Sequence, residues 1–576
     1  MDHYIYDPLQ EYVGVFRDRF SQVAKDTFAQ LAAEAHVDVE ANRATCRQLH
    51  DSQHSLDNVL EKLSGWTGAR SFLWVVIVVA FIAAAIIRND RNGALAPILV
   101  LVGVAGLIFV FGKVNPRISE LRDNSTALER DTKRLMAEAE EQMEPLNRLY
   151  DWDVFARMMA RTVPNLEFDP YFTTQRLADL KATYNWDKKF NEGRSVVFSH
   201  SGLINGNPFV ICRTRKKEWT TKVYTGSKTI YWTTRCRRSD GSYYTERHSQ
   251  TLTASFEAPY PVFPEKTRLI YGNTAAPDLI FYRRQSQLAG KEGKLSFKWK
   301  VYKLRKKARD LSNADFAMMT NEEFEACFET SDRNDNQQFA LLFTPLAQES
   351  MLRLLRDREV GYGDDFDFEK HQMINTIVAE HMQDLDLDMN PDLYRTYDYD
   401  KAEHDFYEIN SRFFRAIYFC LAPLLCVPMY QQIRPLSEIY GHNMARHSSF
   451  WEHEALANFW GYDKFKHPDC VTRCILKTEV AEDAGDDSVI TVYADGFRAV
   501  KRVAFVEKWG GDGRIHEVPV PWDEYLEVRG TGQLLIHEDN HFDDAEISQL
   551  ERLSHISDVL ASKNLDVYRR HIASKV

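Results

Sequence analysis

The chain has 576 residues, of which 44% are hydrophobic, and a formal net charge of −12. This excludes a fibrous, low-complexity or wholly disordered protein. Its mean hydropathy of −0.43 confines any membrane-spanning part to a local segment. The eight cysteines are scattered along the chain, which argues against a disulfide framework and favours a reducing compartment.

Residues 67–112 predict a transmembrane hairpin. Two uncharged runs, of 17 residues at 71–87 and 21 residues at 92–112, flank a short turn. As helices they would span roughly 26 and 32 Å, close to the hydrocarbon thickness of a bilayer. Neither run contains an ionisable side chain, and the only amide is Asn92 at the edge of the second run, which favours a tether over an ion channel or proton path. The first run begins too late for a cleaved signal peptide, and a buried helical hairpin of a soluble protein is the alternative.

The turn at 88–91 is too short to hold a domain, so both ends of the hairpin would lie on one side of the membrane. That side is flanked by five basic residues: Lys62, Arg70, Lys113, Arg117 and Arg122. The positive-inside rule therefore predicts a multi-pass protein of the cell (inner) membrane with both termini cytoplasmic.

Polar helices are expected on both flanks, as N-terminal cytoplasmic helices in 1–66 and a stalk helix in 113–150. Leu49, Leu56 and Leu63 are seven residues apart, and so are Val114, Leu121, Leu128 and Leu135. Heptads on two helices that leave the membrane together predict an antiparallel coiled-coil stalk. Small residues inside the spans permit close helix packing, within the hairpin or in a homo-oligomer: Ala80, Ala84, Gly103 and Gly106.

The remaining chain predicts an α+β fold, with a basic α+β domain at 151–400 and a C-terminal α+β lobe at 401–576. Hairpin turns are expected at Asn205-Gly206, at Asp240-Gly241 and around the Gly-rich stretch 510–513. Residues 294–304 alternate as a half-buried strand with a basic outer face. Helices are expected at 344–359 and 368–383.

Three later segments complete the predicted elements. Residues 384–392 alternate Leu with Asp, which fits a strand with an acidic face, because an EF-hand loop would need Gly at its sixth position and Glu at its twelfth. The uncharged run 416–430 is shorter than a membrane span and favours a buried core element over a third membrane segment. Residues 544–570 predict a terminal helix.

One stretch, NEEFEACFETSDRNDNQQFALLFTPLAQESMLRLL, follows the hairpin and the GLINGNPFVI strand pair. In this order the chain resembles a bacterial family of two-span membrane proteins whose cytoplasmic domain has no assigned function. The resemblance covers roughly residues 60–390. It implies a helix or strand with Phe324 and Phe328, then a strand ending at Leu342, Thr344 and Pro345, then a helix. It implies no catalytic residue.

The charge is distributed unevenly, because residues 213–309 hold 23 Lys and Arg against 7 Asp and Glu. Three basic runs stand out: Arg213, Arg215, Lys216 and Lys217; Arg235, Arg237 and Arg238; and Lys303, Arg305, Lys306, Lys307 and Arg309. They predict a surface for anionic membrane lipid, or for a protein partner, or for docking on the chain's own acidic segments, such as 364–369 and 384–392. Nucleic acid, stacked on neighbouring tyrosines and tryptophans, is the least favoured partner.

Motifs for a metal site or a catalytic site are weaker than the charge pattern. His467, Cys470 and Cys474 offer zinc ligands, but their spacing is not that of a zinc knuckle, so neither a metal ion nor another cofactor is expected. The sequence contains no GxSxG or Walker A motif, and no catalytic residue is assigned. The predicted function is a membrane-anchored cytoplasmic interaction or scaffold protein. The alternatives are an enzyme in the C-terminal lobe, with zinc as its candidate metal, and a channel of assembled hairpins.

Overall fold

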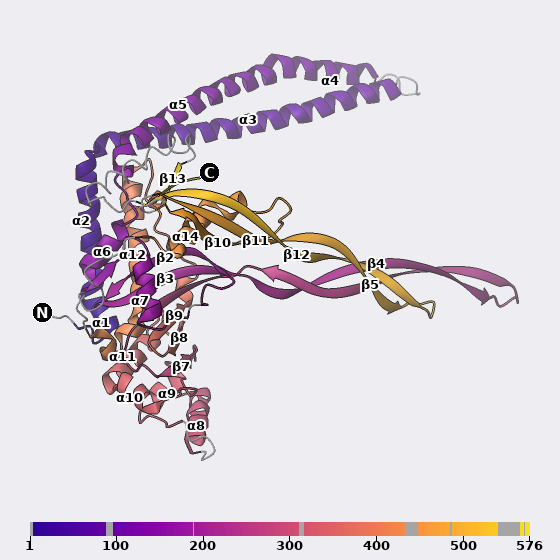
Figure 1. The fold of residues 1–576 in the computed structure, drawn as a ribbon. Helices are drawn as coiled ribbons and strands as arrows, with labels where there is room; N and C mark the ends of the chain where they lie inside the picture. Colours follow the sequence, from indigo (N-terminus) through magenta and orange to yellow (C-terminus); the bar gives the residue numbers. More distant parts are fainter. Residues whose placement is uncertain are drawn as a thin grey trace. The chain divides into compact units, whose positions relative to one another are not determined.

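The computed structural model describes residues 4–87, 96–187, 189–309, 316–432, 447–483, 487–538, 565–568 and 571–575. The chain divides into two compact units. Unit 1 comprises residues 1–24, 151–390 and 410–576, and unit 2 comprises residues 25–150 and 391–409. The α+β class is confirmed, because long apolar helices are followed by a region rich in sheet (Figure 1). The predicted turn at 88–91 lies outside the described residues.

Unit 2 is built on long helices. Helix α3 spans Val39–Ile87, and α4 (Ala96–Phe109) continues through a π-helical turn (Val110–Val114) into α5 (Asn115–Asn147). The helix over 39–86 and the one over 96–147 are each long and apolar enough to cross a membrane. Side-chain hydrogen bonds pair Ser52 with Thr132 at 3.0 Å and Asn42 with Gln142 at 3.3 Å. Since the paired numbers run in opposite directions, α3 and α5 are antiparallel.

The residues of the predicted heptads lie on the facing sides of these helices. Leu49 is buried and Leu56 and Leu63 are half-buried in α3. The buried residues from the π-helical turn to the end of α5 recur mostly at spacings of three and four: Val114, Ile118, Leu121, Ser125, Leu135, Ala139, Met143 and Leu146. Such spacing places one stripe of each helix against its partner.

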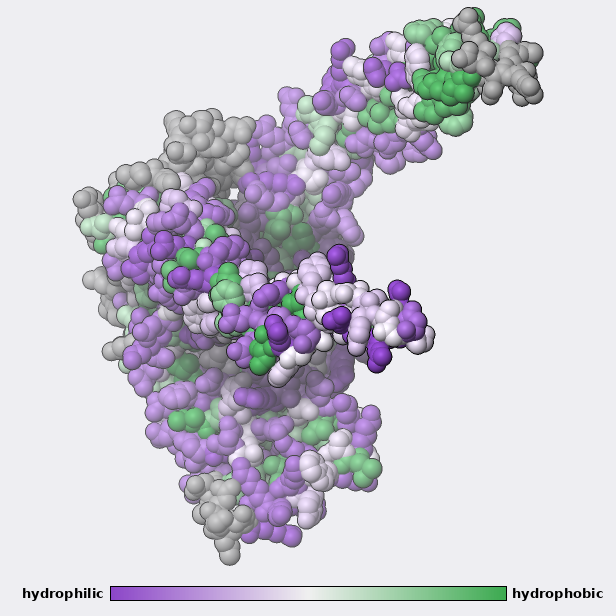
Figure 2. All heavy atoms as spheres, turned by 90° about the vertical axis from the view of Figure 1, so that its right-hand side faces the viewer, coloured by the Kyte–Doolittle hydropathy of each residue, from purple (hydrophilic) through white to green (hydrophobic). Residues whose placement is uncertain are grey.

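The apolar parts of α3 and α4 also pack together. A Cβ added at Gly103 would lie 2.8 Å from the Phe81 ring, and one at Gly106 would lie 2.8 Å from Ile77. The small residues therefore pack one span against the other within the hairpin. The other sides of both helices are exposed and apolar, and Figure 2 shows this apolar surface near the end of the helical pair.

A segment from far along the sequence completes unit 2. Residues 391–409 contain the start of α12 (Tyr399–Leu425), and residues 25–35 end α2 (Arg17–Ala35). The Phe28 ring packs against Tyr399 and Phe406, with centroids 5.6 and 5.5 Å apart. Arg43 donates two hydrogen bonds from Nε and Nη2 to the Asp400 carboxylate. The base of the helical pair is thus held by residues some 350 positions away in the sequence.

The described residues of unit 1 form three antiparallel sheets. The first has seven strands in the order β1-β2-β3-β6-β9-β8-β7, namely Leu166–Phe168, Arg194–Ile204, Asn207–Lys216, Glu265–Gly272, Ile374–Ala379, Phe366–His371 and Ile280–Arg283. The second has the order β10-β11-β12-β14-β13, namely Ile475–Asp483, Asp487–Trp509, Ile515–Glu538, His571–Lys575 and Leu565–Tyr568. The third is the ribbon of β4 (Glu218–Arg237) and β5 (Tyr243–Val262).

Helices surround these sheets. The α-helices of unit 1 not named above are α1 (Pro8–Glu11), α6 (Val154–Thr162), α7 (Thr174–Ala182), α8 (Leu295–Arg309), α9 (Glu322–Phe328), α10 (Asn336–Leu342), α11 (Pro345–Arg356) and α14 (Phe450–Trp460). A π-helical turn covers Tyr12–Phe16, and short 3₁₀ turns cover Glu380–Met382, Pro391–Leu393, Pro428–Gln431 and Tyr462–Lys464. The Thr344 hydroxyl caps α11 and Pro345 begins it, as the sequence predicted for the turn before that helix.

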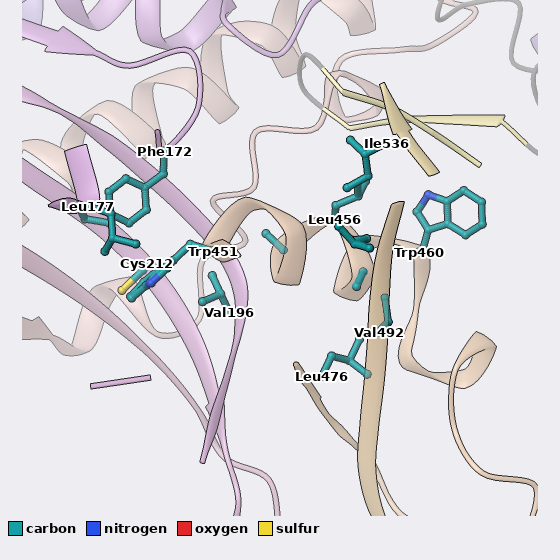
Figure 3. Packing of buried hydrophobic residues seen from close by; sticks show 14 of the residues in the cluster. Phe172, Leu177, Val196, Cys212, Trp451, Leu456, Trp460, Leu476, Val492 and Ile536 are labelled. Carbon is teal, nitrogen blue, oxygen red and sulfur yellow. The ribbon is translucent and has the colours of Figure 1, made fainter. Parts of the chain in front are cut away.

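The main core of unit 1 lies around α14, which packs against β2 of the first sheet and against β10 of the second. Figure 3 shows Trp451 on the side of Val196 and Cys212, and Leu456 and Trp460 on the side of Val492 and Ile536. Because α14 is buried on nearly all sides, it serves as the shared core of both sheets.

The predicted hairpins are confirmed. Asn205 and Gly206 adopt φ of 51° and 74° between β2 and β3, as a two-residue turn of this kind requires. Gly241 adopts φ of 89° between β4 and β5, and the Gly-rich stretch 510–513 joins β11 to β12. The uncharged run 416–430 is confirmed as a core element, since its residues up to Val427 are buried in and just after α12.

The predicted strand at 294–304 is wrong, because residues 295–309 form α8. The same apolar residues satisfy a helical period, which places Phe297, Val301 and Leu304 on one buried face. The predicted helix at 368–383 is wrong too, because β8 and β9 form a hairpin there with Gln372 at φ of 56°.

Three further predictions fail in part. Residues 384–392 form no strand, and Leu387 and Met389 are buried within an irregular segment. The segment before Thr344 is helix α10, capped by Asp335, where the resemblance implied a strand. Most of the predicted terminal helix at 544–570 lies outside the described residues, and Leu565–Tyr568 is strand β13.

Candidate interaction surfaces

The first basic run lies on β3 and is engaged by the chain itself. The Arg213 side chain donates from Nε to the Thr267 hydroxyl at 2.9 Å and from Nη2 to the Gln383 carbonyl at 2.9 Å. It also bonds the neighbouring carbonyls of Met382 and Leu385. Arg213 therefore holds the irregular acidic segment through its backbone and not through its carboxylates.

The other members of this run are also paired. Arg215 is buried, forms an ion pair with Glu265 at 2.9 Å and donates to the Asn458 side chain at 2.9 Å. Lys216 pairs with Glu218 at 3.0 Å, and Lys217 pairs with Glu527 at 2.7 Å. These four cations connect elements within unit 1, which leaves little of their charge for an external ligand.

The second basic run lies at the end of a long arm. Strands β4 and β5 pair with one another over 20 residues each, which corresponds to about 66 Å of extended chain. Part of this ribbon rests on the extensions of β11 and β12 through a small apolar cluster of Ile230, Leu252, Ala254, Val518 and Val520. We refer to residues 218–262 with 500–525 as the arm (Figure 1).

The tip of the arm, residues 233–247, extends beyond that apolar cluster. It contains four arginines against two acidic residues. The guanidinium of Arg235 lies 4.5 Å from the ring centroid of Tyr243, and that of Arg238 lies 5.3 Å from the ring centroid of Tyr244. Arg237 approaches the Tyr243 ring at 6.0 Å. Stacking on tyrosine restricts these long side chains and presents their charge at the tip.

The third basic run is divided between two faces of α8. On the inner side, Arg305 forms a two-pronged ion pair with Glu322, and Lys307 donates to the Ser331 carbonyl. On the outer side, Lys303 lies 3.4 Å from the ring centroid of Trp299. Lys306 and Arg309 are exposed along the same helix. The twelve basic residues therefore form no single patch, and the exposed ones lie at the tip of the arm and on α8.

Docking on an acidic segment through a carboxylate is seen at Asp364, with an arginine outside the three runs. Arg283 on β7 forms a fully buried ion pair with Asp364. The same carboxylate accepts hydrogen bonds from the backbone N–H groups of Ser286 and Gln287. This pair fixes the loop after β7 to the loop before β8.

The candidate zinc ligands do not converge. The Cys470 and Cys474 sulfurs are buried and 3.6 Å apart, and the His467 side chain is partly exposed beside Asp469. No group of three His, Cys, Asp or Glu side chains in the described part of the chain is arranged to hold a metal ion.

A buried polar network that the sequence did not predict lies at β6, β8 and β9. Lys370 has no exposed surface and donates from Nζ to the carbonyls of Gln372 at 2.6 Å and Ala275 at 3.0 Å. Burial lowers the pKa of Lys370 to about 7. The Tyr430 hydroxyl donates to the Asn375 side chain at 2.6 Å beside it. A lysine in an alternating strand gives no sign that it faces the core.

The lowered pKa of Lys370 predicts a pH dependence of stability. Between pH 7 and about 10.4 the unfolded chain holds this proton while the folded chain releases it, so stability rises with pH across that range. The contribution amounts to about 2 kcal/mol between pH 7 and pH 9. Urea unfolding measures the free energy of unfolding of the detergent-solubilised chain and of Lys370→Met at pH 7 and at pH 9. The rise in this free energy between the two pH values should be about 2 kcal/mol larger for the unmodified chain. Equal pH slopes for the two proteins would contradict the prediction.

No family model, curated protein or solved structure matches this chain. The resemblance to two-span bacterial membrane proteins therefore stays a prediction.

Proposed function

We propose that this protein is a membrane-anchored interaction protein of the cell inner membrane, with unit 1 and both termini on the cytoplasmic side. Helices α3 and α4 provide the anchor, and the arm provides a binding element for a partner. The observation that carries the proposal is a pair of apolar helices with exposed side chains, on a chain whose other unit is a sheet-rich α+β body with a long two-stranded arm.

The exposed apolar surface of the helical pair supports the anchor. Phe72 and Ile86 on α3 and Leu101 and Ile108 on α4 are each about two-thirds exposed. Exposed apolar side chains over the length of a bilayer are stable in lipid and costly in water. Trp74, near the start of the first apolar run, packs edge to face with Phe111, near the end of the second. Aromatic rings at the ends of spans favour a membrane interface.

The stalk is proposed as an antiparallel coiled coil. Burial at spacings of three and four in α5, opposite Leu49 on α3, is the pattern that knobs-into-holes packing requires. The polar pairs Ser52–Thr132 and Asn42–Gln142 fix the register of the two helices.

The arm supports an interaction role, because a long ribbon that adds little to the core of unit 1 exposes a large surface. Its tip carries an excess of arginine, held by Tyr243 and Tyr244. Opposite charge on a partner would speed association and select among partners. The partner proposed for the tip is therefore an acidic protein surface.

Alkaline extraction of membranes tests the anchor. Introducing arginine at three lipid-facing positions of α3, Val75→Arg, Val79→Arg and Ile82→Arg, should move the protein from the membrane pellet to the soluble or aggregated fraction, because charge is costly in the hydrocarbon region. The matched control introduces three arginines on the exposed apolar side of the arm: Val223→Arg, Val503→Arg and Phe505→Arg. The unmodified chain and the control should both stay in the pellet. Release of the unmodified chain at alkaline pH would refute the anchor.

A further inference from the structure

Helix α8 has two apolar faces, and the described residues of unit 1 cover only one of them. Phe297, Val301 and Leu304 are buried on the inner face, which packs against α9. On the opposite face Leu295, Trp299 and Tyr302 follow the i, i+4, i+7 spacing and are 85%, 60% and 63% exposed. A surface helix of a soluble protein has one apolar stripe, so the second stripe needs an occupant.

Basic side chains surround the exposed stripe. On a helical wheel Lys306 falls within it, and Lys298, Lys303 and Arg309 flank it. The helix contains seven basic residues and no acidic one. Lys300 and Arg305 pair with Glu329 and Glu322, whereas the four outer cations are exposed and form no ion pair with the described residues.

We propose that this outer face of α8 binds the anionic phospholipid surface of a bilayer. Lysine and arginine meet lipid phosphates while their stems cover apolar surface, and leucine, tryptophan and tyrosine enter the boundary between headgroups and acyl chains. An acidic protein partner would explain the charge but not a leucine exposed at 85% beside an exposed indole ring. The inference rests on the proposed function, because the chain's own membrane supplies the lipid.

The Lys303 ammonium lies over the Trp299 ring, 3.4 Å from its centroid. This arrangement suits binding to a lipid surface. The contact holds a cation and an amphipathic ring on the same side of the helix. On the other side, Arg305 and Lys307 fasten α8 to Glu322 and Ser331. The helix is thereby fixed to unit 1 with its outer face available, and lipid binding would give unit 1 a second membrane contact besides the anchor.

Hydrogen exchange of the full chain in lipid nanodiscs tests the inference. One set of discs contains phosphatidylcholine alone, and the other contains phosphatidylcholine with phosphatidylglycerol. Amides of residues 295–309 should exchange about tenfold more slowly in the anionic discs, and high salt should reverse the effect. Exchange in α9 and α11 serves as the reference for an intact fold.

Charge reversal separates this surface from the arm. The variant Lys303→Glu, Lys306→Glu, Arg309→Glu should lose the slowing, and the matched variant Arg235→Glu, Arg237→Glu, Arg238→Glu should keep it. Equal exchange in both discs, or slowing that survives reversal on α8, would overturn the inference while the anchor stands. If the slowing grows with protein concentration in either type of disc, the outer face of α8 binds a second copy of the chain, and the inference is overturned. Failure to enter discs of either composition would overturn both the anchor and the inference.

Discussion

Replacing Asp364 with alanine is expected to lower the free energy of unfolding by about 3–5 kcal/mol, because it leaves a buried arginine without its counter-charge. Arg283 and Asp364 both have fully buried side chains. The carboxylate also accepts hydrogen bonds from the hydroxyl of Ser286 and from the backbone N–H groups of Ser286 and Gln287. The loss therefore combines an unpaired cation with several orphaned donors.

Urea unfolding of the detergent-solubilised chain measures this effect. The double variant Arg283→Met, Asp364→Leu should recover much of the loss, because it removes both buried charges together. The matched control breaks an exposed pair of the same type with Glu322→Ala, which removes the partner of Arg305 and should cost about 1 kcal/mol or less. Equal losses for Asp364→Ala and Glu322→Ala would contradict the assignment of a buried pair.

Replacing Trp451 with alanine is expected to cost about 3–5 kcal/mol, because it leaves a cavity in the main core of unit 1. The Trp451 ring packs against Phe172 and Trp186, with centroids 5.4 and 5.3 Å apart, and stacks with Phe190 at 5.9 Å. The Trp451 indole N–H is buried and has no acceptor among the described residues. Trp451→Phe should therefore cost much less than Trp451→Ala, within about 1.5 kcal/mol.

Thermal or urea unfolding followed by near-ultraviolet circular dichroism checks this prediction. The matched control is Trp509→Ala, because Trp509 is exposed near the turn between β11 and β12, and its loss should change stability by about 0.5 kcal/mol or less. A large loss for Trp509→Ala, or a small one for Trp451→Ala, would show that α14 is not the shared core of the two sheets.

Local chemistry predicted the hairpins and the apolar helices. Asn205-Gly206 and Asp240-Gly241 specify tight turns through residues that tolerate positive φ, and the uncharged runs specify long apolar helices. Where two periods fit the same residues, sequence alone could not decide. Residues 295–304 alternate in polarity and also satisfy a helical period, and packing against α9 selects the helix.

The candidate surfaces could be predicted only in part. A local excess of Lys and Arg is visible in the sequence, but the partners of Arg215 lie at Glu265 and Asn458, which only the folded chain brings near. Lys370 gives no signal, because an alternating strand can place a lysine on either face. The outer face of α8 was hidden by the mistaken strand, although Leu295, Trp299 and Tyr302 have helical spacing in the sequence.

The proposed function places unit 1 on the cytoplasmic side of the membrane, and labelling of Cys236 tests this placement directly. Cys236 lies at the tip of the arm and is only half-buried. The other described cysteines are buried, except Cys46, whose pKa is raised to about 11 by burial. A membrane-impermeant maleimide should label Cys236 in inverted inner-membrane vesicles and not in right-side-out cells, with Cys236→Ser abolishing the label. Labelling of Cys236 from the outside of intact cells would contradict a cytoplasmic unit 1.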